Sequence, residues 1–306
     1  MLVPALLNAQ TGFGVVNISV CNLRDTPRYS AEMVSQGLLG TPVHILRHGG
    51  DYGWPEVMTP EGYTGWVHKD AITEMSEKDY RAWNASEKVV VTALFSIVRE
   101  TPSPRGAVLS DVVGGDRLKL HFRSRGFWKV EFPDGRTGYI PGRDAEPESS
   151  WRARVSHDAP DVLATALSMN GFPYLWAGMS PKGMDCSGYV RAVLWMHDII
   201  IPRDASEQAL VGESIYGREN LIPGDLVFFG RMDGDTPRVS HVGFYLGDER
   251  FIHCLGLVKI ASFDPESPEY DAYNTGRYLF GGRVLPYLNA RPGITTSAEN
   301  GFYSQK

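Results

Sequence analysis

A cysteine and a histidine stand in the order expected of a nucleophile and its base. Residues 185–190 read Asp-Cys-Ser-Gly-Tyr-Val, which places Cys186 where a helix would begin. The unpaired N–H groups and the dipole of a helix N-terminus favour a thiolate over a thiol. His241 begins the stretch His-Val-Gly-Phe-Tyr-Leu, whose alternation predicts a strand. We expect Cys186 to attack a carbonyl carbon and His241 to take the thiol proton.

A second histidine is placed to orient the first. His253 lies in the next apolar run, Phe-Ile-His-Cys, and is expected to bind the far ring nitrogen of His241 and fix its tautomer. The backbone N–H of Cys186, in the first helical turn, is a candidate donor to the oxyanion. The alternative is a buried structural cysteine with unrelated histidines.

The other cysteines and histidines suggest no second chemistry. Strand alternation puts His253 and Cys254 on opposite faces, so we expect no metal site, and no cofactor is required. Cys21 is expected to be a buried apolar side chain. The remaining histidines have no visible partner and are expected at the surface: His44, His48, His68, His121, His157 and His197.

Four motifs in a fixed order carry a family resemblance. They are Gly-Phe-Pro-Tyr-Leu-Trp-Ala-Gly at 171–178, Asp-Cys-Ser-Gly at 185–188, Pro-Gly-Asp-Leu-Val-Phe-Phe at 223–229 and Ser-His-Val-Gly-Phe-Tyr-Leu-Gly at 240–247. Over residues 155–287 the chain resembles the NlpC-type cysteine peptidases of bacterial cell-wall metabolism. With the two upstream modules described below, it resembles the dipeptidyl-peptidase VI group, γ-D-glutamyl-L-diamino-acid endopeptidases acting on peptidoglycan peptides.

The resemblance implies a substrate site around the thiol. It implies that Asp185 holds the free α-amino group of an N-terminal L-Ala; a helix N-cap is the alternative, compatible with that role. It also implies that four more residues line the pocket: Tyr174, Trp176, Ser187 and, by a looser match, Ser206. In this group the first SH3-like module adds an acid and an aromatic residue. Glu32 matches the acid, with a solvated charge as its alternative, and the aromatic is either Tyr63 or Trp66.

Composition narrows the class of protein. The chain has 306 residues, a net charge of −6 and no basic block, which argues against a nucleic-acid partner. Its 3 cysteines form no CxxC pair and no disulfide framework. No stretch approaches the ~20 apolar residues of a membrane span. We expect a monomer.

Residues 1–13 read as an N-terminal arm or the remnant of a secretory signal. An apolar run ends in Leu-Asn-Ala at 7–9, which resembles a cleavage site, but the basic segment that starts such signals is missing. A signal remnant predicts a protein of the cell envelope or periplasm; the alternative is the cytoplasm.

An internal repeat organises the first half. Pro-Glu-Gly-Tyr-Thr-Gly-Trp-Val at 60–67 corresponds to Pro-Asp-Gly-Arg-Thr-Gly-Tyr-Ile at 133–140, and each follows a tryptophan, Trp54 or Trp128. Pro-acid-Gly predicts a hairpin turn. We expect two SH3-like domains, at 14–84 and 85–150, with a helix over 76–83 between the barrels and a linker at 146–150.

Residues 151–288 have helices first and strands afterwards, the α+β pattern. Asp158 and Pro160 predict a helix start, and further helices are expected at 186–197 and 204–211. Strands are expected at 226–229, 242–246, 251–254 and 283–285, and the polar tail 289–306 is expected on the surface. The fold class is therefore multidomain: two small all-β SH3-like barrels, then an α+β papain-like cysteine peptidase domain.

These observations predict a cysteine endopeptidase that cuts the γ-D-glutamyl–L-diamino acid bond. The diamino acid would be L-Lys or meso-diaminopimelate, in peptidoglycan-derived peptides with a free N-terminal L-Ala, during recycling or degradation of wall fragments. A thiol amidase or acyltransferase is one alternative, and a catalytically inactive wall-fragment-binding protein is another.

Overall fold

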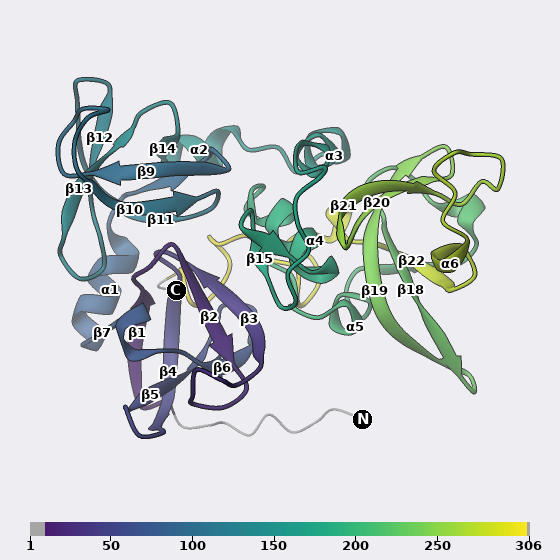
Figure 1. Cartoon of the computed structure of the whole chain (residues 1–306), viewed down its shortest axis with the longest axis horizontal. Helices are drawn as coiled ribbons and strands as arrows, with labels where there is room; N and C mark the ends of the chain where they lie inside the picture. Colours follow the sequence, from purple (N-terminus) through teal and green to yellow (C-terminus); the bar gives the residue numbers. More distant parts are fainter. Residues whose placement is uncertain (1–9, 305–306) are drawn as a thin grey trace. The chain divides into compact units, whose positions relative to one another are not determined.

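The computed structural model describes residues 10–304. They form two compact units, one containing residues 10–149 and 301–304, the other residues 150–300 (Figure 1). The cleavage-site resemblance at 7–9 lies outside the described residues.

The first unit holds two seven-stranded sheets with one topology. The strand order is β3-β2-β6-β5-β4-β1-β7 in the first and β10-β9-β13-β12-β11-β8-β14 in the second, the same order displaced by seven strands. The first sheet comprises β1 (Gly12–Val16), β2 (Val20–Arg24), β3 (Met33–Leu38), β4 (Pro42–Gly49), β5 (Trp54–Met58), β6 (Thr64–Trp66) and β7 (Ile72–Met75), with a 3-10 turn at Lys69–Ala71. The second comprises β8 (Lys88–Val91), β9 (Phe95–Arg99), β10 (Val108–Val113), β11 (Arg117–Ser124), β12 (Phe127–Glu131), β13 (Thr137–Pro141) and β14 (Ala145–Pro147).

The repeated Pro-acid-Gly segments form the turns that the sequence predicts. One joins β5 to β6 and the other β12 to β13. Gly62 and Gly135 occupy the same place in these turns, with φ of +84° and +86°, a conformation that favours glycine. The repeat in sequence is therefore a repeat in structure.

The two barrels form one unit because they share buried contacts. Leu39, at the end of β3, is fully buried in the apolar core of the second barrel. Its backbone N–H donates to the Asp116 carboxylate at 3.0 Å, and its carbonyl accepts from the N–H of Arg117 at 2.9 Å. Removal of the first barrel would thus expose core of the second.

The helix predicted between the barrels is present, but the linker predicted at 146–150 is not. Helix α1 (Glu77–Ala85) begins after Ser76, whose hydroxyl accepts from the N–H of Asp79. Residues 146–150 form the end of β14 and the start of α2 (Glu148–Arg154). Strand β14 pairs with β8 through Ala145, Glu146 and Pro147. Composition alone does not reveal this pairing.

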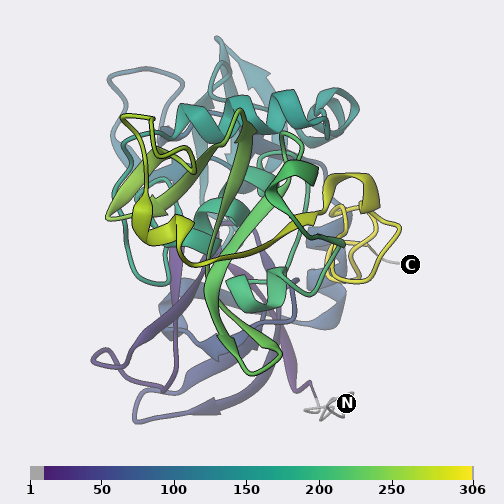
Figure 2. The ribbon, with the colours of Figure 1, turned by 90° about the vertical axis from the view of Figure 1, so that its right-hand side faces the viewer.

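In the second unit, helices precede a six-stranded sheet of order β17-β22-β18-β19-β20-β21. The helices are α3 (Ala159–Ser168), α4 (Cys186–Trp195), α5 (Ala205–Gln208) and α6 (Ala272–Thr275), with 3-10 turns at Arg218–Asn220 and Leu285–Tyr287. The sheet comprises β17 (Glu213–Ile215), β18 (Leu226–Asp233), β19 (Thr236–Gly247), β20 (Arg250–Leu255), β21 (Leu257–Ser262) and β22 (Tyr278–Arg283), and a small hairpin pairs β15 (Met179–Ser180) with β16 (Gly183–Met184). Strands β18 and β19 form the long green hairpin of Figure 2.

Helix α4 is the buried element that carries the cysteine. It packs on β19 and α3. Tyr189 meets Phe244 edge to face with 6.0 Å between ring centroids, and its hydroxyl donates to the Ala166 carbonyl at 2.9 Å. Because both ends of this tyrosine are fixed, the first turn of α4 is held at a defined place over the sheet.

Three expectations for this unit were wrong. The last strand is β22 at 278–283, and Leu285 begins a 3-10 turn instead. Helix α5 covers only 205–208 of the expected 204–211. The tail lies only in part at the surface: Ile294 and Ser297 are fully buried, and Ser297 binds Asp198. Its isolated apolar residues have no periodicity that could signal burial.

The end of the tail belongs to the first unit. The ring of Phe302 stacks on His44 at 4.1 Å between centroids, and its carbonyl accepts from Asn84 Nδ2 at 2.9 Å. Burial raises the pKa of Tyr303, which lies under the Arg117 guanidinium. Among helices in residues 10–304, none is both long and apolar enough to cross a membrane.

Candidate active site

The motif around Cys186 places this residue at the first position of α4. Asp185 has an extended backbone, and its carboxylate accepts from the N–H of Gly188 at 2.6 Å, which caps the helix. Gly188 is required by close approach, since a Cβ there would lie 1.9 Å from the carbonyl oxygen of Gly178. The N-cap interpretation of Asp185 is therefore confirmed.

The thiol of Cys186 lies beside the strand that carries His241. The backbone N–H groups of Ser187 and of Val242, the residue after His241, act to lower the pKa of the thiol, against the effect of burial. Within residues 10–304 no hydrogen bond joins the sulfur directly to His241. The backbone N–H of Cys186 likewise donates to no acceptor in the described chain. That N–H is thus available to a developing oxyanion.

The two histidines lie on neighbouring strands and are hydrogen-bonded. His241 is 6% exposed on β19 and His253 is fully buried on β20. Gly243 pairs with His253 in register, and a Cβ at Gly243 would lie 2.9 Å from the Cβ of His253. This glycine leaves the space in which His241 Nε2 and His253 Nδ1 approach to 2.7 Å. The Nδ1 atom of His241 remains as the nitrogen that can take a proton from the thiol.

Burial sets the charge state of these groups, and it opposes the thiolate expected from the helix N-terminus. Burial, followed by the Asp185 charge, raises the pKa of Cys186 to about 11. Burial, followed by the Arg277 charge, lowers the pKa of His241 to about 4, and burial with the neighbouring His241 lowers that of His253 to about 3. At neutral pH the resting site therefore holds a neutral thiol and neutral imidazoles. The helix N-terminus is outweighed by desolvation and by the adjacent carboxylate.

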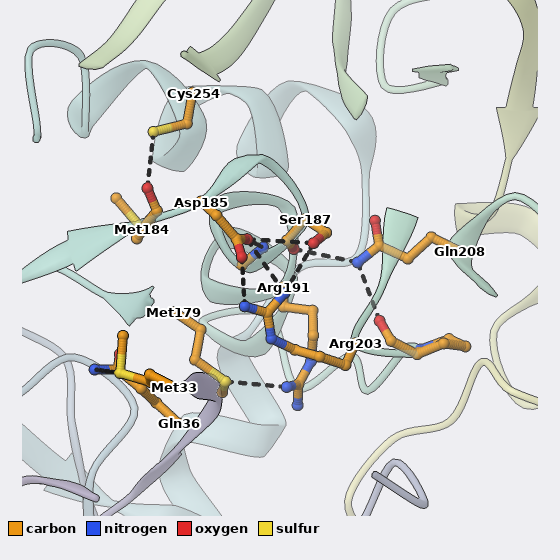
Figure 3. Close-up of polar contacts among 12 residues, drawn as sticks. Met33, Gln36, Met179, Met184, Asp185, Ser187, Arg191, Arg203, Gln208 and Cys254 are labelled. Atoms are coloured by element: carbon orange, nitrogen blue, oxygen red, sulfur yellow. Dashed lines mark hydrogen bonds and ion pairs between the residues drawn. The ribbon is translucent and has the colours of Figure 1, made fainter. Parts of the chain in front are cut away.

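A buried ion pair supports the start of α4 (Figure 3). Arg203 is 1% exposed, and its Nη2 donates to Asp185 Oδ2 at 2.6 Å while its Nη1 donates to Ser187 Oγ at 2.8 Å. Gln208 Nε2 reaches the carbonyls of Ser187 and Pro202 at 3.1 and 3.0 Å. Asp185 and Ser187 are thus held rigidly beside the nucleophile.

The other expected pocket residues differ in how exposed they are. Burial, followed by the charges that Cys186 and Asp185 carry when ionised, raises the pKa of Tyr174 to about 12. Trp176 is 60% exposed, and Ser206 is exposed on α5.

The residues expected from the first module lie in the other unit. Glu32 is exposed at the start of β3, and Tyr63 packs against the first barrel's core. Trp66 is 8% exposed and lies beneath the guanidinium of Arg47. Their part in the site stays a prediction.

Comparison with known proteins assigns each region. Residues 171–275 match the NlpC/P60 family, residues 23–72 the bacterial dipeptidyl-peptidase Sh3 domain, and residues 92–145 the bacterial SH3 domain. The chain is 31% identical to a gamma-D-glutamyl-L-lysine dipeptidyl-peptidase of Bacillus cereus over 231 residues, 72% of this chain and 67% of that one. It belongs to the NlpC/P60 family.

Further relatives agree with this assignment. A dipeptidyl-peptidase 6 of Lysinibacillus sphaericus is 28% identical over 266 residues, 84% of this chain and 93% of that protein. The crystal structure of an NlpC/P60 family protein from Bacillus cereus superposes with a TM-score of 0.75 at 25% identity, covering 90% of this chain and 100% of the other. The protein is a cysteine-type peptidase, with two SH3-like domains before its NlpC/P60 domain.

Sequence reasoning missed two charged residues of this NlpC/P60 domain. Arg203 follows a proline in a short loop, and nothing local reveals that it binds a carboxylate 18 positions earlier. Asp271 caps α6 and has its Oδ2 atom 3.8 Å from His253 Nε2.

One of the six histidines expected at the surface was also misjudged. His197 is 7% exposed and binds the Ser156 carbonyl and the Thr165 hydroxyl, so it is a buried structural residue. Cys21 and Cys254 are both fully buried, and burial raises the pKa of each to about 12.

Proposed function

We propose that this NlpC/P60 peptidase hydrolyses the bond between γ-D-glutamate and an L-diamino acid in peptidoglycan-derived peptides that begin with a free L-Ala. The observation that carries the proposal is the fixed carboxylate of Asp185 directly before the nucleophile, in a chain related to gamma-D-glutamyl-L-lysine dipeptidyl-peptidases. A carboxylate beside the thiol opposes thiolate formation, and Asp185 is already paired with Arg203, so a substrate ammonium would add to this pair rather than complete it.

The chemistry follows from the neutral resting site. As Cys186 Sγ attacks the γ-carbonyl carbon of the glutamate, its proton moves to Nδ1 of His241. We expect the oxyanion to accept from the N–H of Cys186 and from the hydroxyl of Tyr174, which is protonated at neutral pH. The C–N bond then breaks, and His241 returns the proton to the leaving α-amine. Water, activated by His241, hydrolyses the thioester and frees the peptide carboxylate and the thiol.

Two carboxylates, those of Asp185 and Asp204, are candidates to recognise the N-terminal ammonium. Asp185 already binds Arg203, so its charge is balanced before substrate arrives. Asp204 is half-buried, and burial, together with the Asp185 charge, raises its pKa although Arg203 acts in the opposite direction. An ammonium would relieve this unfavourable placement of Asp204. A capped substrate would therefore bind less well because the Asp204 carboxylate stays unsatisfied, while the Asp185–Arg203 ion pair remains intact.

The test is mass spectrometry of products from matched peptides. L-Ala-γ-D-Glu-L-Lys and its meso-diaminopimelate analogue should each yield L-Ala-γ-D-Glu and the free diamino acid. The N-acetylated peptides should react roughly a hundredfold more slowly in kcat/KM, since the ammonium is lost. Asp204→Asn should reduce that preference, while Glu207→Gln, at an exposed acid of the adjoining short helix, serves as the matched control.

Two outcomes would contradict different parts of the proposal. Equal rates on capped and free peptides would contradict the proposal that the site recognises a free α-ammonium. Cleavage at another bond, or none in either free peptide, would reject the substrate assignment. A location in the cell envelope and a monomeric state stay predictions.

A further inference from the structure

The buried histidine pair has a proton that lacks a hydrogen-bond acceptor. His241 can serve as a base through Nδ1 only if that atom is unprotonated, so its proton must sit on Nε2. Nε2–H then donates to His253 Nδ1 across the 2.7 Å contact, and the proton of His253 must sit on its own Nε2. That Nε2 atom is fully buried and has no hydrogen-bond partner among the described residues.

One carboxylate faces this orphaned atom. Asp271 Oδ2 lies 3.8 Å from His253 Nε2. The carboxylate is oriented by its own helix: Oδ1 accepts from the N–H of Asn274 at 3.0 Å, and Oδ2 accepts from Asn274 Nδ2 at 2.6 Å. A movement of about 1 Å would bring Asp271 and His253 to hydrogen-bond distance. Asn274 is itself fully buried, so Asp271 is supported from behind.

We propose that Asp271 is a positioning residue of the peptidase reaction, extending the Cys186–His241–His253 arrangement by a fourth group. Its carboxylate accepts the Nε2 proton of His253. This selects the tautomer that leaves Nδ1 of His241 free. It also stabilises the positive charge that the histidine pair acquires when the thiol proton arrives. This role rests on the peptidase chemistry and not on the identity of the peptide substrate.

The charges around the histidine pair determine in which direction its pKa should move when one of them is removed. Asp271 and Asp185 favour the protonated pair, whereas Arg277 and Lys259 oppose it. Lys259 lies opposite His253 in the register of β20 and β21, and Arg277 Nη2 donates to the hydroxyl of Ser240 at 2.6 Å. Asp271 is therefore one of two negative groups set against two positive ones, and its removal should make the pair harder to protonate.

The test compares Asp271→Asn with Arg277→Gln in the full chain. Asparagine can keep the oxygen that caps α6, but it removes the charge and puts an NH2 donor in place of the oxygen that faces His253. We expect Asp271→Asn to lower kcat about tenfold and to move the acid limb of kcat/KM to lower pH by about one unit. Arg277→Gln removes an opposing charge and should move the same limb to higher pH. Asp264→Asn, at an exposed acid whose Oδ1 accepts from the N–H of Glu266 at 2.9 Å, should leave the limb unchanged.

A spectroscopic measurement keeps the test independent of any substrate. In protein labelled with ¹⁵N-histidine, His241 and His253 should both carry their proton on Nε2 at neutral pH, and Asp271→Asn should mix the two tautomers. An unchanged acid limb together with unchanged tautomers would overturn the proposal, even if the variant were less stable, and Asp271 would then be a helix cap alone. Failure of every peptide to be cut, with the tautomers behaving as expected, would instead count against the proposed substrate.

Discussion

The two ends of the candidate site handle charge in opposite ways. At the start of α4, the Asp185 carboxylate is buried but receives a backbone N–H, a hydroxyl and the Arg203 guanidinium. On β19 and β20, two histidines are buried as neutral rings, and the outer nitrogen of His253 has no hydrogen-bond partner among the described residues. A fully paired charge fixes geometry, whereas a pair of neutral imidazoles can take up a proton at the one nitrogen that has none, Nδ1 of His241. The difference separates a binding end of the site from a proton-transfer end.

The largest expected effect lies at the nucleophile. Cys186→Ala should fold normally and lose turnover by roughly a thousandfold or more, and His241→Ala should lose nearly as much, because nucleophile and base act together. His253→Ala should lose less, since the base remains and only its orientation suffers. Steady-state rates with a free tripeptide measure this order.

The buried cysteines provide the matched control. Cys21→Ala and Cys254→Ala remove sulfurs that lie in the protein interior, so both variants should keep activity within about threefold. Substantial activity in Cys186→Ala, or its loss in Cys21→Ala, would contradict the assignment of the nucleophile.

The next effect tests the paired end of the site. Arg203→Met leaves the Asp185 carboxylate buried without its cation and should lower the free energy of unfolding by about 3–5 kcal/mol. The double variant Asp185→Asn/Arg203→Met removes both charges and should recover part of that loss. Urea denaturation of the two variants and of wild type measures the coupling. Equal destabilisation of single and double variants would show that the ion pair does not carry the stability.

These two ends also differ in how far sequence alone could predict them. Cys186 and His241 stand in local motifs whose glycines, Gly188 and Gly243, permit close packing that no other residue would allow, so their positions were readable. Arg203 and Asp271 act on residues 18 positions away in the chain, through loops that have no motif. The protonation of the thiol was also unpredictable, because desolvation depends on the whole fold rather than on the residue before it.

The architecture was predictable for a similar reason. The Pro-acid-Gly repeats specify turns, and turns specify hairpin register, so two barrels of one topology follow from local sequence. The tail was misjudged because Ile294, Phe302 and Tyr303 act as single anchors, without a periodic pattern.

A smaller, gradual effect tests the neutral histidines. Folding lowers the pKa of His241 from 6.5 to about 4 and lowers that of His253 to about 3. Between these values and 6.5 the unfolded chain binds more protons than the folded one, so stability is complete above pH 6.5 and is lost as pH falls below it. Urea denaturation from pH 7.5 to pH 4.5 should show this loss, and His253→Gln should make it shallower. A stability that does not change over this range would contradict the burial of neutral rings.

The most direct test of the account is to identify the covalent intermediate. The p-nitroanilide of L-Ala-γ-D-Glu, joined through the γ-carboxyl, has a good leaving group, so hydrolysis of the thioester should limit its turnover. Acid quenching during turnover, followed by intact mass measurement and peptide mapping, should find one L-Ala-γ-D-glutamyl group on Cys186 and none on Cys21 or Cys254. Turnover without any adduct, or an adduct on another residue, would contradict the assignment of Cys186 as the nucleophile.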